Sequence, residues 1–240
     1  MTTLVVGASG ETGRLLVEQL LNRGESVRVI VRSDANLPET IKNHTGLSIT
    51  QASITEMSDT ALAELVAGCD AVASCLGHTL SFKGVYGQPR RLVTDTVRRI
   101  CTVIQKNASE QPVKYVLMNT TGNKNQDLSE HTSFRHNAVI GLLRLLLPPH
   151  VDNEKAADFL RTKIGQNNPA IEWVAVRPDG LIDNPDVSEY DLHPSPTRDP
   201  IFDSGQTSRI NVAHFMAELM TNTETWAPWK GQMPVIYNRN

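Results

Sequence analysis

The sequence has few cysteines, no cluster of like charges and no long apolar run. Its 3 cysteines in 240 residues lie singly, at Cys69, Cys75 and Cys101, so we expect buried reduced thiols and no bound metal. The net charge of −3 and the scattered lysines and arginines give no electrostatic case for nucleic acid or an anionic membrane. The most apolar segment, residues 138–147, contains Arg144 and is far shorter than the roughly 20 residues of a membrane span. An apolar run already begins at residue 3, where a signal peptide would have its basic region. We therefore expect a cytoplasmic protein.

Segments typical of strands alternate with segments typical of helices. Strands are indicated by β-branched runs, and helices by apolar residues three and four positions apart. The predicted strands cover residues 4–6, 26–31, 47–53, 71–76, 113–118, 171–176 and 233–237; the predicted helices begin near residue 12, cover 58–67, begin at Pro89, and cover 133–147, 152–164 and 212–220. This alternation implies crossover connections and a parallel sheet. The predicted fold is α/β, a doubly wound Rossmann sheet with helices on both faces, in a single domain over residues 1–240.

Two segments are predicted to form a small substrate-side region, at about 123–150 and 179–206. Residues 179–203 are rich in proline and poor in apolar side chains, so we expect an irregular excursion, and long loops are often functional. Ser58 and Gly68 are expected to cap the two ends of the helix between them.

The sequence GASGETG places three glycines at a strand-to-helix turn. Gly7 permits the tight turn, Gly10 has no Cβ and lets a diphosphate approach the backbone, and Gly13 lets the helix pack close to the sheet. The N–H groups of the first helical turn favour a phosphate. The strand before the turn and the helix after it make the motif indicative of a dinucleotide site. The residues predicted to bind the cofactor here are Gly7, Ser9, Gly10, Glu11, Thr12 and Gly13.

The end of the second predicted strand bears on the choice of dinucleotide. An NAD-specific fold usually has Asp or Glu there, on the adenosine ribose. This chain has Arg32 and Ser33, which can pair with a 2′-phosphate. We therefore expect NADP, while Asp34 keeps NAD open as the alternative.

Five segments in this order resemble one enzyme family. GASGETG, VIVRS, GCDAVASCLG, VLMNTTG and EWVAVRPDGLI resemble the atypical short-chain dehydrogenases/reductases, in particular their NmrA-like, NAD(P)H-binding branch. The later SRINVAHFMAELM resembles the flavin reductase/biliverdin reductase B type. The resemblance implies a Rossmann fold and further cofactor contacts. These would be Ser53 and Ile54 at the adenine, Cys75, Leu76 and Gly77 along the ribose and phosphates, Thr120 and Thr121 near the nicotinamide, and Pro178 beside its carboxamide. The family usually has Asp where Ser53 stands.

The Tyr-x-x-x-Lys pair of the alcohol-oxidising members of this family is missing. None of the four tyrosines is followed four residues later by lysine. Lys155 falls where the resemblance places the family lysine, which binds the nicotinamide ribose, so Lys155 is also a predicted cofactor contact. Val151 stands at the tyrosine position. His150 lies beside that position, and His78 follows a predicted strand end; either could act in its place. Thr121 corresponds to a site serine of the flavin reductase type, so the predicted catalytic residues are Thr121, Lys155 and His150.

An intact cofactor site without an obvious proton donor favours particular chemistry. Carbonyl reduction needs a positioned acid, whereas hydride transfer to a conjugated acceptor depends mainly on orientation. The sequence therefore predicts an NADPH-dependent oxidoreductase acting on a small planar acceptor such as a flavin or quinone. A non-catalytic, NAD(P)-binding redox-sensing regulator of the NmrA type is the alternative. We expect a monomer or homodimer.

Overall fold

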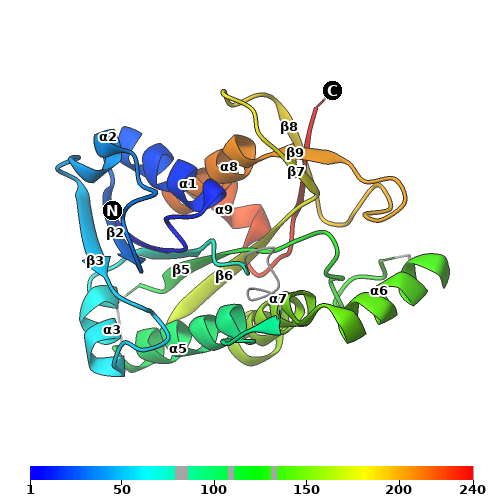
Figure 1. Ribbon diagram of the computed structural model, residues 1–240, viewed down its shortest axis with the longest axis horizontal. Helices are drawn as coiled ribbons and strands as arrows, with labels where there is room; N and C mark the ends of the chain where they lie inside the picture. Colours follow the sequence, from blue (N-terminus) through cyan, green and yellow to red (C-terminus); the bar gives the residue numbers. More distant parts are fainter. Residues whose placement is uncertain (79–85, 108–110, 131–133, 240) are drawn as a thin grey trace.

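The main feature of the molecule is a mostly parallel sheet, seen in a computed structural model that describes residues 1–78, 86–107, 111–130 and 134–239 (Figure 1). Within these ranges the sheet has eight strands in the order β3-β2-β1-β4-β5-β6-β10-β8. They are β1 (Thr2–Val6), β2 (Ser26–Val31), β3 (Leu47–Gln51), β4 (Ala71–Ser74), β5 (Val113–Met118), β6 (Ile171–Pro178), β8 (Tyr190–His193) and β10 (Val235–Asn238). The strands pair in parallel, except β8, which is antiparallel to β10. The predicted fold class is confirmed.

Helices cover both faces of this sheet (Figure 1). One face carries α1 (Glu11–Asn22), α2 (Glu39–Lys42), α8 (Arg209–Thr221) and α9 (Thr223–Trp229). The other carries α3 (Asp59–Val66), α5 (Leu92–Lys106) and α7 (Pro148–Phe159), which continues into a π-helical turn, η1 (Leu160–Ile164). α6 (Phe134–Leu146) extends away from the body beside α7. A small separate sheet pairs β7 (Gly180–Ile182) with β9 (Gln206–Ser208).

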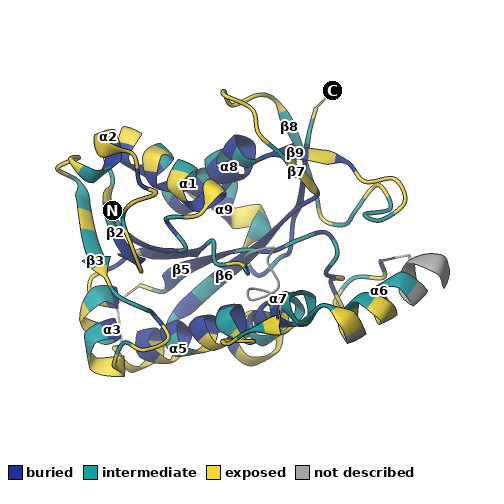
Figure 2. Ribbon diagram, in the orientation of Figure 1, coloured by how far each residue is buried: buried dark blue, intermediate teal, exposed yellow. Residues whose placement is uncertain are grey.

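Alternating strand side chains divide the core into two layers. In β1, Leu4 and Val6 join the layer that includes residues of α3, α5 and α7, while Val5 joins the layer with α1 and α8. Figure 2 shows the central strands buried and the outer faces of the helices exposed. Because successive side chains of a strand point to opposite faces, an apolar run such as that of β1 is typical of a strand covered on both sides.

Local capping follows the predicted pattern in the third helix. Ser58 Oγ accepts a hydrogen bond from the N–H of Ala61 at 3.1 Å, the usual N-cap contact. Gly68 lies just beyond the other end with a φ of +70°, a conformation that glycine adopts without penalty.

Several predicted elements differ from those of the structure. Residues 179–203 are not wholly irregular, because they contain β7 and β8, and β8 extends the main sheet. The helix predicted to begin at Pro89 begins at Leu92, because the Asp152 carboxylate accepts from the N–H groups of Val93 and Thr94 and so caps the helix there. The helix predicted from residue 152 begins four residues earlier, because Pro148 and Pro149 suit its first turn. The start predicted at residue 133 lies outside the described residues.

The fold brings several loops to one edge. In a parallel sheet the carboxyl ends of the strands meet, so the loops after β1, β2, β4, β5 and β6 open on the same side. None of the helices, within the described ranges, combines the length and the apolar character needed to cross a bilayer. The single-domain organisation stays a prediction.

Candidate functional site

The three glycines of the first loop have the conformations and neighbours that the motif predicts. Gly7 has a φ of +79°, and a Cβ there would lie 2.5 Å from the carbonyl carbon of Cys75. A Cβ on Gly13 would overlap the carbonyl of Gly7, so α1 approaches the loop only because residue 13 is glycine. Gly10 is exposed, and a Cβ there would approach only the Gly7 oxygen, at 3.3 Å. The loop thus leaves its outer side open for a ligand.

The amino end of α1 is suited to an anion. Gly10 occupies the N-cap without a side-chain cap, and the first bond within the helix runs from Arg14 N–H to the Gly10 oxygen. The N–H groups of the preceding three residues therefore have no partner within the helix, and the helix dipole favours negative charge there. Thr12 is buried and Ser9 half-buried. This arrangement fits a diphosphate.

Glu11, predicted to bind the cofactor, also makes an ion pair. Its carboxylate lies 2.9 Å from Nε of Arg209 at the start of α8. Arg209 also contacts Asp183, at 2.9 Å. The cation balances an acidic side chain that would otherwise repel a phosphate at this helix end.

The end of β2 presents a positive charge to solvent. Arg32 and Ser33 are exposed, and in the described part of the chain no hydrogen bond or ion pair engages the Arg32 guanidinium. Ser33 Oγ accepts from the N–H of Ala35 at 3.2 Å, which tightens the turn. The end of β2 therefore carries an exposed cation.

Arg99 of α5 fixes the loop after β3. Its guanidinium donates to the carbonyls of Ile54 and Met57 and pairs with Asp59. Ile54 is buried and Ser53 half-buried, with Ser53 Oγ 2.9 Å from the Thr55 hydroxyl. The predicted adenine contacts are therefore held in a defined loop.

Residues after β4 continue the same edge. Cys75 and Leu76 are half-buried, and Gly77 is exposed. Burial of the thiol raises the pKa of Cys75 to about 12, so the sulfur stays protonated. His78 does not point into an open site, since its Nε2 lies 2.8 Å from the buried Asp152.

Asp152 is a structural carboxylate that caps a neighbouring helix. It accepts from the N–H groups of Val93 and Thr94 at 2.8 and 3.0 Å and so caps α5 from another helix. Burial opposes its charge, but the hydrogen bonds from His78 and Thr94 lower its pKa. Asp152 lies 58 and 59 positions from the residues whose N–H groups it caps. The sequence around the start of α5 therefore does not reveal this cap.

The ends of β5 and β6 are joined at the predicted nicotinamide side. Thr121 N–H donates to the carbonyl of Pro178 at 3.1 Å. The Thr121 hydroxyl donates to Asp179 at 3.1 Å, and both side chains are buried. Thr120 Oγ1 accepts from Gly122 N–H at 3.3 Å. Asp179 is a further site residue that sequence analysis missed.

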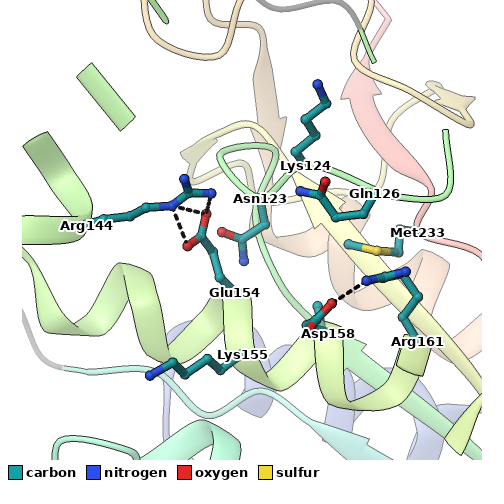
Figure 3. A pocket seen from close by; sticks show the side chains of 10 residues that line it. Asn123, Lys124, Gln126, Arg144, Glu154, Lys155, Asp158, Arg161 and Met233 are labelled. Carbon is teal, nitrogen blue, oxygen red and sulfur yellow. Dashed lines mark hydrogen bonds and ion pairs between the residues drawn. The ribbon is translucent and has the colours of Figure 1, made fainter. Parts of the chain in front are cut away.

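Lys155 and His150 lie on α7, and the His150 ring is next to the loop after β5, since a Cβ on Gly122 would lie 3.5 Å from His150 Cε1. Lys155 is exposed and lines a cavity of about 290 Å³ with Glu154, Arg144, Asp158 and other residues (Figure 3). His150 Nε2 lies 3.4 Å from Glu154 Oε1. Burial opposes the charge of Glu154, but His150 and Arg144 lower its pKa to about 2. These groups form an ion cluster on α6 and α7.

A larger cavity lies beside Thr121. It measures about 480 Å³, and its wall includes Gly122, Lys124, Glu130 and residues 195–200. This volume is in the range of small-molecule sites. Both predicted substrate-side segments contribute to it, although residues 131–133 of the first lie outside the described residues. No group of three His, Cys, Asp or Glu side chains in the described ranges is arranged to hold a metal.

The wall of this cavity depends on a buried ion pair. Arg177 of β6 is fully buried and contacts both carboxylate oxygens of Glu130, at 2.7 and 3.2 Å. Its guanidinium also donates to the carbonyls of Asn123, Pro194 and Met233. One side chain thus ties the loop after β5, the loop after β8 and the approach to β10.

Comparisons with known proteins agree with this geometry. The family model described as NAD(P)H-binding matches residues 7–223. A short-chain dehydrogenase/reductase from Veillonella parvula in complex with NADP has a TM-score of 0.70 at 13% identity, covering 100% of this chain and 95% of that chain. A candidate NADH-flavin reductase from Streptococcus pneumoniae has a TM-score of 0.68 at 18% identity, covering 100% of both chains. The anaerobilin reductase ChuY from Escherichia coli O157:H7 has a TM-score of 0.68 at 17% identity, covering 100% and 98%.

Sequence similarity to curated proteins is confined to a short stretch. An uncharacterized chloroplastic protein of Arabidopsis thaliana is 42% identical over 62 residues, which are 26% of this chain and 22% of that protein. The solved structures show the fold, and the family model covers most of the chain, including the glycine turn and the ends of β1 to β6. The chain belongs to the NAD(P)H-binding family, as its resemblance to the atypical short-chain dehydrogenases/reductases implies.

Proposed function

We propose that this protein is an NADPH-dependent reductase that delivers a hydride to a small planar acceptor, such as a flavin or a quinone. The observation that carries the proposal is the first loop: Gly7 and Gly13 leave no room for a side chain, Gly10 leaves the outer side of the loop open, and the helix that follows has no side-chain cap at its amino end. Family membership and the reductases among the structural neighbours support it.

The chain's own groups would hold the cofactor along the edge of the sheet. The N–H groups that begin α1 would bind the diphosphate. Arg32, exposed at the end of β2, would pair with the 2′-phosphate, which favours NADP over NAD. Thr120, Thr121 and Pro178 would bound the nicotinamide side. Bound there, the reduced cofactor supplies a hydride.

The acceptor would bind in the 480 Å³ cavity beside Thr121. One wall comes from the loop after β5 and the other from the loop after β8. Arg177 and Glu130 fix both walls, and a preformed site lowers the entropic cost of orienting the acceptor. A monomer or homodimer suffices for this proposal, because one chain supplies every residue named.

A second function is favoured by one observation. The position four residues before Lys155 is Val151, so the tyrosine acid of the related dehydrogenases is missing. A redox-sensing regulator would bind the dinucleotide without turning it over.

Steady-state oxidation of NADPH with FMN, FAD and quinones separates the two functions. If the protein is a reductase, we expect turnover with at least one acceptor. We also expect calorimetry to show tighter binding of NADPH than of NADH. Tight NADPH binding without turnover on any acceptor would support the regulator. If neither dinucleotide binds at moderate salt, both proposals are wrong.

A further inference from the structure

A buried carboxyl group lies behind the wall of the Thr121 cavity. Asp179 follows β6 directly and is 7% exposed, while Thr121 is 5% exposed. Thr121 Oγ1 lies 3.1 Å from Asp179 Oδ1, and Gly205 N–H donates to Asp179 Oδ2 at 2.8 Å. Thr121 lines the cavity, so Asp179 can act on a molecule there through the threonine hydroxyl.

The protonation of Asp179 decides what Thr121 presents to the cavity. An ionised carboxylate only accepts, so the Thr121 proton must point toward Asp179 and only oxygen lone pairs face the cavity. A protonated Asp179 can donate to Thr121 Oγ1, which frees the hydroxyl proton for a molecule in the cavity. One proton on a buried group therefore converts Thr121 from acceptor to donor.

The hydrogen bonds at Asp179 do not fully offset its burial. Burial raises the pKa of Asp179, whereas the N–H groups of Gly205 and Gly180 and the Thr121 hydroxyl act to lower it. The net direction is upward, because hydrogen bonding recovers only part of the lost hydration of a charge. Asp179 holds a proton at higher pH than an exposed aspartate does.

Two further groups face Asp179 from neighbouring elements. Arg198, on the loop after β8, lowers the pKa of Asp179 through its charge, but it is itself paired with Asp203 at 2.6 Å. Tyr237, on β10, has its pKa raised by burial and by the charge of Asp179, so it stays neutral. Neither group takes the role of Asp179.

We propose that Asp179 and Thr121 supply the proton that completes reduction of the acceptor, with Asp179 holding the proton and Thr121 transferring it. This inference rests on the proposed reductase function. A hydride brings two electrons and one hydrogen to the acceptor, which becomes an anion. The Thr121 O–H proton passes to that anion while the Asp179 proton passes to Thr121 Oγ1. Asp179 is left ionised and regains a proton from water. Thr121 is the catalytic residue and Asp179 a positioning residue.

Asp179→Asn tests the proton-holding role with little change of shape. The amide can donate to Thr121 and accept from Gly205 N–H, as the acid does, but it has no transferable proton. We expect wild-type kcat to fall as pH rises through the titration of Asp179. The variant should lose that pH dependence. At pH values where Asp179 of the wild type is protonated, the kcat of the variant should be lower than that of the wild type on the order of 10- to 100-fold, near the low end of general acid catalysis. NADPH binding by calorimetry should persist.

Substitutions at Thr121 keep the test valid if Asp179→Asn fails to fold. Thr121→Val should abolish the pH dependence, and Thr121→Ser, which keeps the hydroxyl, should restore it. Thr120→Val is the matched control, because the Thr120 hydroxyl contacts a backbone N–H and, among the described residues, no carboxylate. It should leave the pH dependence in place, whatever it does to the rate.

A second readout needs no turnover. A raised carboxyl pKa means that the folded state binds more protons than the unfolded state at pH values above the ordinary aspartate pKa of about 3.8. The contribution of Asp179 to stability is therefore lost as pH rises toward its folded pKa. Urea unfolding of unliganded wild type and Asp179→Asn should show this difference in pH dependence.

The outcomes distinguish this inference from the proposed function. Wild-type turnover with an unchanged pH profile in Asp179→Asn and in Thr121→Val overturns the relay and leaves the reductase standing. Wild-type protein that binds NADPH but turns over no acceptor overturns both. Loss of the pH dependence in Asp179→Asn and Thr121→Val, with its rescue in Thr121→Ser, supports the relay.

Discussion

Replacing Arg177 by methionine would remove a cation that the fold has already desolvated. The guanidinium is fully buried and makes five hydrogen bonds, two of them to Glu130. Methionine is similar in length but leaves the Glu130 carboxylate and three carbonyls without their partner. Removing one member of a buried pair costs about 3–5 kcal/mol. For a chain of this size each kcal/mol lowers Tm by about 2–4 °C, so we expect a decrease of roughly 6–20 °C.

Urea unfolding followed by circular dichroism measures this change. Arg239→Met is the matched control, because Arg239 also pairs with two carboxylates, Asp191 and Glu189, but is 55% exposed. Exposed pairs contribute little, so the control should lose far less stability. Equal losses in Arg177→Met and Arg239→Met, or a loss below about 1 kcal/mol at Arg177, would show that the buried pair does not stabilise the fold as argued.

Three further predictions concern the cofactor loop and its neighbours. Arg32→Asp should weaken NADPH binding on the order of 10- to 100-fold while barely affecting NADH, because charge-assisted hydrogen bonds are lost; calorimetry that finds the same preference as wild type would remove the NADP argument. Gly13→Ala should prevent tight packing of α1 against Gly7 and reduce both stability and NADPH affinity, whereas Gly141→Ala, at a helical glycine with open space around it, should be neutral or stabilising in thermal unfolding. Cys75, with its pKa raised to about 12, should resist iodoacetamide at pH 8, and rapid modification seen by mass spectrometry would contradict its burial.

The first half of the fold was predictable because its signals are local. The β-branched run of β2, the glycines at 7, 10 and 13, and the Ser58 cap each depend on residues a few positions apart. The same holds for the end of β2, where Arg32 lies beside the strand it terminates. These features were readable from spacing alone, and the structure places them as expected.

The side of the fold that holds the Thr121 cavity was less predictable because its contacts are distant in sequence. β8 was missed since its four residues are each half-buried and carry no clear alternation. Asp179 meets Thr121 across 58 positions, and Arg177 meets Glu130 across 47. Buried polar pairs of this kind arise from tertiary packing, and no periodicity marks them.

The position of β10 has a consequence for synthesis of the chain. β10 lies between β6 and β8, and within the described residues β8 pairs with no other strand of the main sheet. β8 and the loop that follows it, which lines the cavity, therefore join the sheet through a strand that is synthesised after them. Strands β1 to β6 can pair before that strand exists, whereas the cavity is completed only when residues 235–238 are added.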